Sequence, residues 1–175
     1  MDAMENMRTR RSVRQYRPDA VPPDVLQRVL TAGTYAPTGM GRQSPILVAV
    51  TDRATRDALA AENARIMGRP GTDTFYGAPV VVVVLADRSM PTYVYDGSLV
   101  MANLMLAAHA EGLGSCWIHR AKEEFDSEFG RALLKKWGID GDYEGIGHCI
   151  LGYAEGALPQ PKPRKADYIH IIDHS

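Results

Sequence analysis

Pro79-Val-Val-Val-Val-Val-Leu-Ala86 is the stretch of this sequence that decides its fold. Its consecutive valines favour an extended backbone, because side chains branched at Cβ pack well on the pleated surface of a sheet. Successive positions are all apolar, so both faces of the predicted strand must be covered. We therefore expect this strand at the centre of a sheet, with helices on each side.

The segments around this strand alternate between helical and extended patterns. Further strands are predicted at Pro45 to Thr51, Leu113 to Ile118 and Gly147 to Gly152. Helices are predicted at Ala3 to Thr9, from Pro22-Pro23-Asp24 onward, at Arg53 to Met67 and at Leu99 to Glu111. A further helix is predicted to carry Phe125, Phe129, Leu133 and Trp137 and to end at Gly138. Helices on both faces of a short sheet make a three-layer α+β protein.

The helix predicted from Leu99 to Glu111 carries two further expectations. Asp96 or Ser98 can cap its start, and Gly112 falls at the position just after its end, where glycine is favoured. Its side chains are apolar almost all the way round. Such a helix belongs inside a protein or at an interface between two chains.

The C-terminal region is predicted to be an arm followed by a strand. Pro159, Pro161 and Pro163 lack the backbone donors that a helix or a central strand needs, so Ala157 to Lys165 is expected to be extended. Tyr168-Ile-His-Ile-Ile172 then predicts a strand. After so long an arm, this strand is expected to pair at a distant place, which can be another subunit.

The chain has 175 residues, and we expect residues 1–175 to form one domain. Lys and Arg total 20 against 21 Asp and Glu, a balance that argues against nucleic acid or an anionic membrane as the main partner. The apolar run from Val80 to Ala86 is too short to span a bilayer, and Met1 to Arg11 lacks the apolar core of a signal peptide. We therefore expect a soluble cytoplasmic protein.

Several common chemistries find no support in the sequence. It lacks a dinucleotide-binding or P-loop glycine motif, a Gly-x-Ser-x-Gly motif, and histidines at zinc-ligand spacing. Cys116 and Cys149 fall in apolar strand candidates, which is more typical of core residues than of nucleophiles. We expect no metal ion.

Two short basic segments are the candidates for binding an anion. Arg10-Arg-Ser-Val-Arg14 gathers three guanidinium groups and a hydroxyl, and Lys162-Pro-Arg164 adds two cations on a rigid backbone. Taken alone, each is also typical of a solvated turn or a linker. Thr38-Gly-Met-Gly41 has two interpretations as well, because its glycines either let the backbone approach a flat ligand or form a flexible turn.

Taken in chain order, six segments resemble motifs of the nitroreductase family of FMN-dependent oxidoreductases. They are Arg10-Arg-Ser-Val-Arg-Gln-Tyr16, Ala36-Pro-Thr-Gly-Met-Gly-Arg-Gln43, Phe75-Tyr-Gly-Ala-Pro79 with the valine strand, Asp96 to Leu106 followed by Gly112-Leu-Gly-Ser-Cys-Trp117, Ile150-Leu-Gly-Tyr153, and Lys162-Pro-Arg164. Each motif is short, but together they cover nearly the whole chain in the expected order. The chain resembles a short member of that family.

This resemblance implies a fold, a cofactor and a reaction. The implied fold is the three-layer nitroreductase-like α+β fold, with a short, mostly antiparallel sheet flanked by helices and a C-terminal strand exchanged in a homodimer. The implied reaction is a ping-pong hydride transfer from NADH or NADPH to FMN at the dimer interface, and then to a nitroaromatic, quinone or similar acceptor. The alternatives are flavin fragmentation, dehalogenation or azoline oxidation on the same fold, or a non-catalytic flavin-binding protein.

The resemblance also assigns cofactor-binding residues, whereas the flavin itself would carry out the chemistry. The phosphate, ribityl chain and pyrimidine edge of FMN fall to Arg10, Arg11, Ser12 and Arg14, with Lys162 and Arg164 completing the phosphate clamp. The other subunit would supply Pro37, Thr38 and Gly39 against the flavin, and Gln43 would be a further cofactor-binding residue. Asn63 would contact the flavin pyrimidine, and backbone N–H groups at Ile118, His119 and Arg120 would reach flavin N5 and O4.

This sequence departs from the family pattern at several positions. Gly41 stands where many relatives have Asn, and His119 and Arg120 replace a Glu-Gly pair. A cation and an ionisable ring are therefore expected near the redox edge of the flavin. Short members also lack additional helices that roof the acceptor site, so the acceptor itself does not follow from the resemblance.

Overall fold

In the computed structural model, which describes residues 1–173, these residues form one four-stranded sheet with the order β1-β2-β4-β3. The strands are β1 (Pro45–Val50), β2 (Val80–Asp87), β3 (Gly114–Ile118) and β4 (Tyr143–Gly152). All three neighbouring pairs are antiparallel. The valine strand is β2, and its expected position inside the sheet is confirmed.

The alternation of side chains along β2 explains why the sheet is covered on both faces. Val81, Val83 and Leu85 pack into one hydrophobic cluster, whereas Val80, Val82 and Val84 pack into another on the opposite face. None of the side chains from Val80 to Ala86 is more than 3% exposed. Burial on both faces excludes water from the whole strand and confirms the three-layer prediction.

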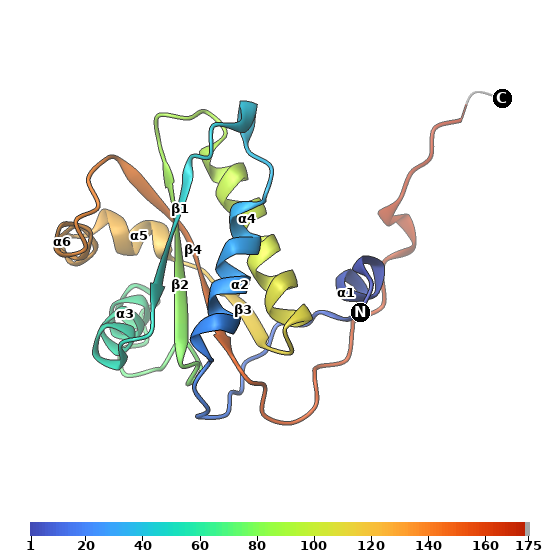
Figure 1. Ribbon diagram of the computed structural model, residues 1–175, viewed down its shortest axis with the longest axis horizontal. Coiled ribbons are helices and arrows are strands. Elements are labelled where there is room, and N and C mark those ends of the chain that lie inside the picture. Colours follow the sequence, from blue (N-terminus) through green and yellow to red (C-terminus); the bar gives the residue numbers. More distant parts are fainter. Residues whose placement is uncertain (174–175) are drawn as a thin grey trace.

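Helices supply the outer layers on both faces of this sheet. They are α1 (Ala3–Thr9), α2 (Pro23–Thr34), α3 (Arg53–Ile66), α4 (Tyr93–Ala110), α5 (Ala121–Asp126) and α6 (Glu128–Lys136), with 3₁₀ turns η1 (Gly39–Gly41) and η2 (Ala166–Tyr168). Figure 1 shows α2 and α4 against one face, and α3, α5 and α6 against the other. The apolar residues of α2 and α4 share the cluster of Val82, and those of α3 and α5 share the cluster of Val83.

The start of α4 differs from the sequence prediction. The helix begins at Tyr93 rather than Leu99, so Asp96 and Ser98 lie inside it and the prediction that one of them caps it is wrong. The buried Asp96 carboxylate instead accepts hydrogen bonds from Gly39 N (3.0 Å), Ser44 Oγ (2.9 Å) and Thr92 Oγ1 (3.1 Å). A loop distant in sequence therefore uses the group that would otherwise cap the helix. Gly112 follows the helix with a φ of 77°, as expected.

The helix predicted to run continuously through Phe125 and Trp137 is also wrong, because it is broken at Ser127. Ser127 adopts an extended conformation between α5 and α6, and its hydroxyl accepts a hydrogen bond from Gly130 N (3.2 Å) as the cap of α6. The four-residue apolar spacing survives the break because both helices pack on the same cluster. The second helix ends before Gly138, whose φ is 68°.

The C-terminal arm leaves the body of the molecule. Residues 158–165 are extended and exposed, as predicted, and they run past α1 (Figure 1). Tyr168 to Ile172 is expected to be a strand, but within the single chain η2 is followed by an exposed segment that pairs with no strand among residues 1–173. A strand forms only where a neighbouring edge accepts its hydrogen bonds, and the arm points away from the sheet of its own chain. Exchange of this segment with a second chain stays a prediction.

None of the helices in residues 1–173 combines the length and the hydrophobicity needed to cross a membrane.

Candidate functional site

The N-terminal basic segment is anchored against the edge strand β3. Ser12 forms an isolated parallel bridge with Ser115, and Val13 N donates to Ser115 O (2.9 Å). Val13 and Tyr16 enter the core, with exposed fractions of 4% and 8%, whereas Arg14 between them remains exposed. The two apolar anchors therefore turn Arg14 outward, where its guanidinium group is free to meet a ligand.

Three buried donors in the N-terminal basic segment and in β3 lack a hydrogen-bond partner within residues 1–173. Arg10 Nη1, Arg11 Nε and Ser115 Oγ are buried and have no hydrogen-bond partner among the described residues. Leaving a buried guanidinium nitrogen unpaired costs on the order of 1–3 kcal/mol or more. None of these three residues lines either of the cavities described below, so these atoms do not by themselves locate a ligand. Ser115 was missed from the sequence, although it lies inside the Gly112 to Trp117 motif.

A cavity of about 350 Å³ opens beside Arg14. Its walls are Arg14, Met67, Arg69, Thr72, Asp73, Thr74, Tyr76, Cys116, Trp117, Ile118, His119 and Arg120. The structure therefore brings four of the expected residues together, namely Arg14, Ile118, His119 and Arg120. A second cavity of about 260 Å³ continues past Ser12 and Arg14 to the base of the C-terminal arm at Ala157 to Pro159.

The loop before β2 forms one wall of the larger cavity and was missed from the sequence. It contains Thr72, Asp73 and Thr74, directly before the Phe75-Tyr-Gly-Ala-Pro79 motif that could have indicated it. Asp73 shapes this loop, because its carboxylate accepts from Phe75 N (2.9 Å), Gly77 N (2.7 Å) and Arg56 Nη2 (2.7 Å). Arg56 is buried, at 3% exposed.

The cavity carries net positive charge. Burial alone would raise the pKa of Asp73, but the hydrogen bonds from Arg56, Phe75 and Gly77 hold it below its ordinary value. The negative charge of Asp73 is thus compensated by Arg56, outside the cavity. Arg14, Arg69 and Arg120 remain as the charged groups in the wall, so the cavity favours an anionic ligand.

The turn after β3 is held by hydrogen bonds to the side chain of Asn63. Asn63 Nδ2 donates to His119 O (2.9 Å), and Asn63 Oδ1 accepts from Arg120 Nε (3.1 Å). Arg120 has a φ of 78°, a left-handed conformation that is strained for a residue with a Cβ. Asn63 is fully buried, and both ends of its amide bind the chain itself. The structure favours a role for Asn63 in holding this turn, and its direct contact with a flavin stays a prediction.

The second expected group of residues lies at the other end of α4. Pro37, Thr38, Gly39 and Gln43 belong to the loop that Asp96 ties to the start of the helix. The basic segment from Arg10 to Arg14 instead follows α1, which packs on the end of α4, where Asn6 Nδ2 donates to Leu106 O (3.0 Å) and Thr9 Oγ1 lies 2.8 Å from His109 Nε2. At about 1.5 Å per residue, these two ends are about 25 Å apart. A single chain does not bring the two groups together.

Lys162 and Arg164 lie on the exposed arm. Only the base of that arm, Ala157 to Pro159, reaches the cavity beside Ser12. Their contact with a phosphate therefore stays a prediction.

Comparisons with known proteins agree with this geometry. The model of the nitroreductase family matches residues 7–153, which include every strand of the described sheet. A protein of Methanothermobacter thermautotrophicus, provisionally named an NADH dehydrogenase/NAD(P)H nitroreductase, is 29% identical over 121 residues, covering 67% of this chain and only 60% of that relative. An NADH dehydrogenase of Thermus thermophilus is 27% identical over 162 residues, covering 91% of this chain and 73% of the relative.

Solved structures resemble the whole chain. A nitroreductase with bound FMN from Bacteroides fragilis is 30% identical, with a TM-score of 0.90 over 99% of this chain and 100% of its own. A nitroreductase with bound FMN from Desulfitobacterium hafniense, at 24% identity and a TM-score of 0.86 over 99% of this chain and 100% of its own, shares the fold.

Proposed function

The chain belongs to the nitroreductase family, and from that premise we propose that it is an FMN-dependent oxidoreductase. The bound FMN would accept a hydride from NADH or NADPH and deliver it, in a ping-pong reaction, to a nitroaromatic, quinone or similar acceptor. We also propose that residues 1–175 act as a single FMN-binding domain. The Bacteroides fragilis nitroreductase, whose match covers 99% of this chain, contains bound FMN, and this supports the choice of cofactor.

The observation that carries this proposal is the cavity of about 350 Å³, whose wall holds the three cations Arg14, Arg69 and Arg120. A phosphate group would suit such a wall, because its oxygens match the forked donors of arginine. Ser12 and Arg14 line the cavity of about 260 Å³, and Arg14 is shared with the cavity of about 350 Å³. A ligand with a phosphate at one end and a flat ring system at the other fits this sequence of groups.

The chain's own residues would bind and orient the cofactor rather than react. Arg14 and Arg120 place positive charge in the wall, and such charge stabilises the negative charge that a reduced flavin carries. The turn from Ile118 to Arg120 lines the same cavity, so its backbone N–H groups are candidates for the ring edge. Hydride transfer needs a fixed distance and orientation, which these groups supply without a side-chain acid.

The site is proposed to form between two copies of the chain. The loop of Gly39 and the segment of Arg14 lie at opposite ends of α4, so a second copy related by a two-fold axis would bring the loop of one chain to the arginines of the other. Exposed apolar side chains on α4, namely Val94, Tyr95 and Leu99, support a covered surface there. A homodimer would bury them.

The exposed end of the C-terminal arm supports the same dimer. Ile169, Ile171 and Ile172 are 78%, 84% and 87% exposed, which is unfavourable in water. The outer edge of β1 pairs with no strand among residues 1–173, so it offers hydrogen-bonding groups to an incoming segment. We infer that the arm of one subunit adds a strand to the sheet of the other.

The proposal is tested by the absorbance spectrum of the purified protein, followed by anaerobic addition of NADH and then NADPH. The expected result is a flavin spectrum that bleaches with at least one nicotinamide and recovers with a quinone or nitroaromatic acceptor. A protein that takes up no FMN would contradict the cofactor assignment. Bound FMN that neither nicotinamide reduces would contradict the reaction and leave flavin binding alone.

A further inference from the structure

A buried chain of polar groups leads from the sheet to the turn that lines the cavity. Glu124 on α5, His148 on β4 and Asn63 on α3 are each 0% exposed. His148 Nε2 lies 3.2 Å from Glu124 Oε2, and Asn63 Nδ2 donates to the same carboxyl oxygen (3.2 Å). Asn63 then holds His119 O and Arg120 Nε, as described above. One carboxyl group is thus connected through one amide to the strained turn.

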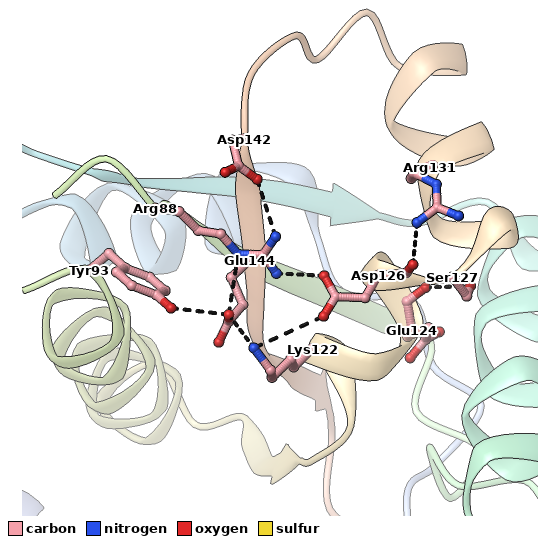
Figure 2. Close-up of polar contacts among 9 residues, drawn as sticks. All are labelled: Arg88, Tyr93, Lys122, Glu124, Asp126, Ser127, Arg131, Asp142 and Glu144. Atoms are coloured by element: carbon pink, nitrogen blue, oxygen red, sulfur yellow. Dashed lines mark hydrogen bonds and ion pairs between the residues drawn. The ribbon is translucent and has the colours of Figure 1, made fainter. Parts of the chain in front are cut away.

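Glu124 differs from the other buried glutamate of this region. Glu144 on β4 is surrounded by cations and donors, because Arg88, Lys122 and Tyr93 all contact its carboxylate (Figure 2). Burial alone would raise the pKa of Glu144, but Lys122 and Tyr93 hold it below its ordinary value, so this group is charged. The carboxyl of Glu124 meets only an amide and an imidazole within hydrogen-bonding distance.

The environment of Glu124 and His148 keeps both groups uncharged near neutral pH. Burial raises the pKa of Glu124 to about 8, and the charge of Glu62 adds to this rise. A hydrogen bond from Asn63 and the charge of Arg120 oppose it. Burial, together with the charge of Arg120, lowers the pKa of His148 to about 3. The imidazole also packs against the rings of Phe75 and Phe125, with centroids 5.2 and 6.3 Å away. The hydrogen bond from Asn63 and the packing of the imidazole against two phenyl rings therefore hold this cluster of neutral groups together, and neither ring nitrogen of His148 has a hydrogen-bond partner among the described residues.

The orientation of the Asn63 amide decides whether its two hydrogen bonds to the turn can form. If the amide rotates by 180°, its oxygen replaces its nitrogen and both contacts with the turn are lost. The contact of Nδ2 with Glu124 Oε2 disfavours that rotation when Oε2 is the acceptor oxygen of the uncharged carboxyl group, because two acceptor oxygens would then face each other. With Asn63 fixed, His119 O and Arg120 Nε are held, and the left-handed backbone of Arg120 is maintained.

We propose that Glu124 is a positioning residue of the FMN site: its carboxyl group fixes the amide of Asn63, and this amide fixes the His119–Arg120 turn that lines the cavity. Glu124 does not touch the ligand, and its effect passes through Asn63. The inference rests on the proposed function in one respect, because FMN is taken as the ligand of the cavity.

The experiment compares Glu124→Ala with Glu124→Gln, and uses Glu144→Gln as the matched control. Flavin fluorescence titration at neutral pH measures the FMN dissociation constant of each variant. Glu124→Ala is expected to raise it about tenfold or more, whereas Glu124→Gln, which keeps the shape and an acceptor oxygen, is expected to stay within about threefold of the parent. Glu144→Gln changes a second buried glutamate, one that faces Arg88 and Lys122, so it is expected to leave FMN affinity unchanged.

A second measurement needs no FMN. Amide hydrogen exchange in the FMN-free protein is expected to be at least about tenfold faster at His119 and Arg120 in Glu124→Ala, and unchanged there in Glu144→Gln. If Glu124→Ala does not fold, Glu124→Leu replaces it, because leucine fills the buried space but offers no acceptor to Asn63 Nδ2; the same losses are expected.

The outcomes separate the two proposals. A Glu124→Ala protein with parental FMN affinity and parental exchange at the turn would overturn the positioning role. So would a Glu124→Gln protein as weak as Glu124→Ala, because the arrangement of hydrogen bonds would then not be what Glu124 supplies. If the parent protein binds no FMN, the proposed function fails, while the exchange comparison still decides whether Glu124 orders the turn.

Discussion

Gly39 donates its backbone N–H to the Asp96 carboxylate (3.0 Å) and lies so close to Thr92 that a Cβ at position 39 would collide with the threonine hydroxyl. The loop that carries Gly39 is therefore pressed onto the first turn of α4. The basic segment that carries Arg14 follows α1, whose Thr9 contacts His109 in the last turn of the same helix. Because the helix is rigid, the two parts of the proposed site stay apart in one chain, and we propose that they share a ligand across two chains.

The substitution Asp96→Asn tests how firmly this loop is held. An asparagine side chain would keep the size of the aspartate but present an NH₂ group to donors that now bind a carboxylate, so the free energy of unfolding is expected to fall by about 1–3 kcal/mol. Urea denaturation measures the change. The control Asp87→Asn alters a half-buried aspartate whose carboxylate accepts from Ser89 N (2.8 Å), and it is expected to cost less. Equal effects of the two substitutions would contradict the importance of the Asp96 contacts.

Arg14→Ala tests the cation that faces the cavity. Loss of a charge-assisted contact is expected to weaken FMN binding by about 1.5–3 kcal/mol, or roughly 10- to 100-fold, without unfolding the protein, because Val13 and Tyr16 still anchor the segment. Flavin titration and thermal unfolding measure the two effects. Arg53→Ala removes an arginine that is paired with Asp57 on α3 and serves as the control. Unchanged FMN affinity in Arg14→Ala would show that Arg14 makes no contact with the negatively charged groups of FMN.

The pH dependence of stability tests the neutral state of Glu124 and His148. Between about pH 6.5 and pH 8, the unfolded chain has lost the Glu124 proton that the folded protein keeps, so stability is expected to fall as the pH rises. Between about pH 3 and pH 4.5, the unfolded chain protonates His148 while the folded protein keeps it neutral, so stability is expected to rise with pH. Each slope is at most about 1.4 kcal/mol per pH unit.

The variant Glu124→Gln isolates the first of these slopes. Its stability is expected to fall less than that of the parent between about pH 6.5 and pH 8, as measured by urea denaturation at several pH values. Glu144→Gln should keep the parental slope in that window, because Glu144 is already ionised there in both states. Parallel curves for the parent and Glu124→Gln would show that Glu124 is charged when folded.

The exposed isoleucines of the C-terminal arm allow a test of strand exchange. The double substitution Ile169→Asp and Ile171→Asp adds charge where we infer an apolar contact with a second subunit, and it is expected to weaken dimerisation at least tenfold. Sedimentation velocity over a range of concentrations measures the dissociation constant. Lys165→Glu, on the same exposed arm, is the control and is expected to have little effect. If neither variant changes the dissociation constant of the dimer, the arm does not cross between subunits.

The parts of this fold that were predictable are those with a periodic apolar pattern. The uninterrupted valines of β2 require two covered faces, and this requirement alone indicates a sheet between two helical layers. The break at Ser127 was not predictable from that pattern, because Phe125 and Phe129 keep their spacing while packing from two different helices.

Contacts between distant segments account for the remaining differences. Asp96 looks like a helix cap locally, and only the folded chain brings Gly39 and Ser44 to its carboxylate. Glu124 sits in a run of charged residues that resembles a solvated face, and nothing near it in sequence reveals that His148 and Asn63 meet it in the core. The motifs that contain Arg14 and His119 lie far apart in sequence, and the folded chain brings both residues to the wall of one cavity, whereas their contact with FMN stays a prediction.

The most direct test of an FMN site built from two chains is sedimentation velocity of the FMN-loaded protein, monitored at the visible absorption band of the flavin. We expect the flavin to sediment with a dimer, at one FMN per chain, and FMN binding to be lost at concentrations where the dimer dissociates. Flavin that sediments with a monomer and stays bound on dilution would contradict the shared site.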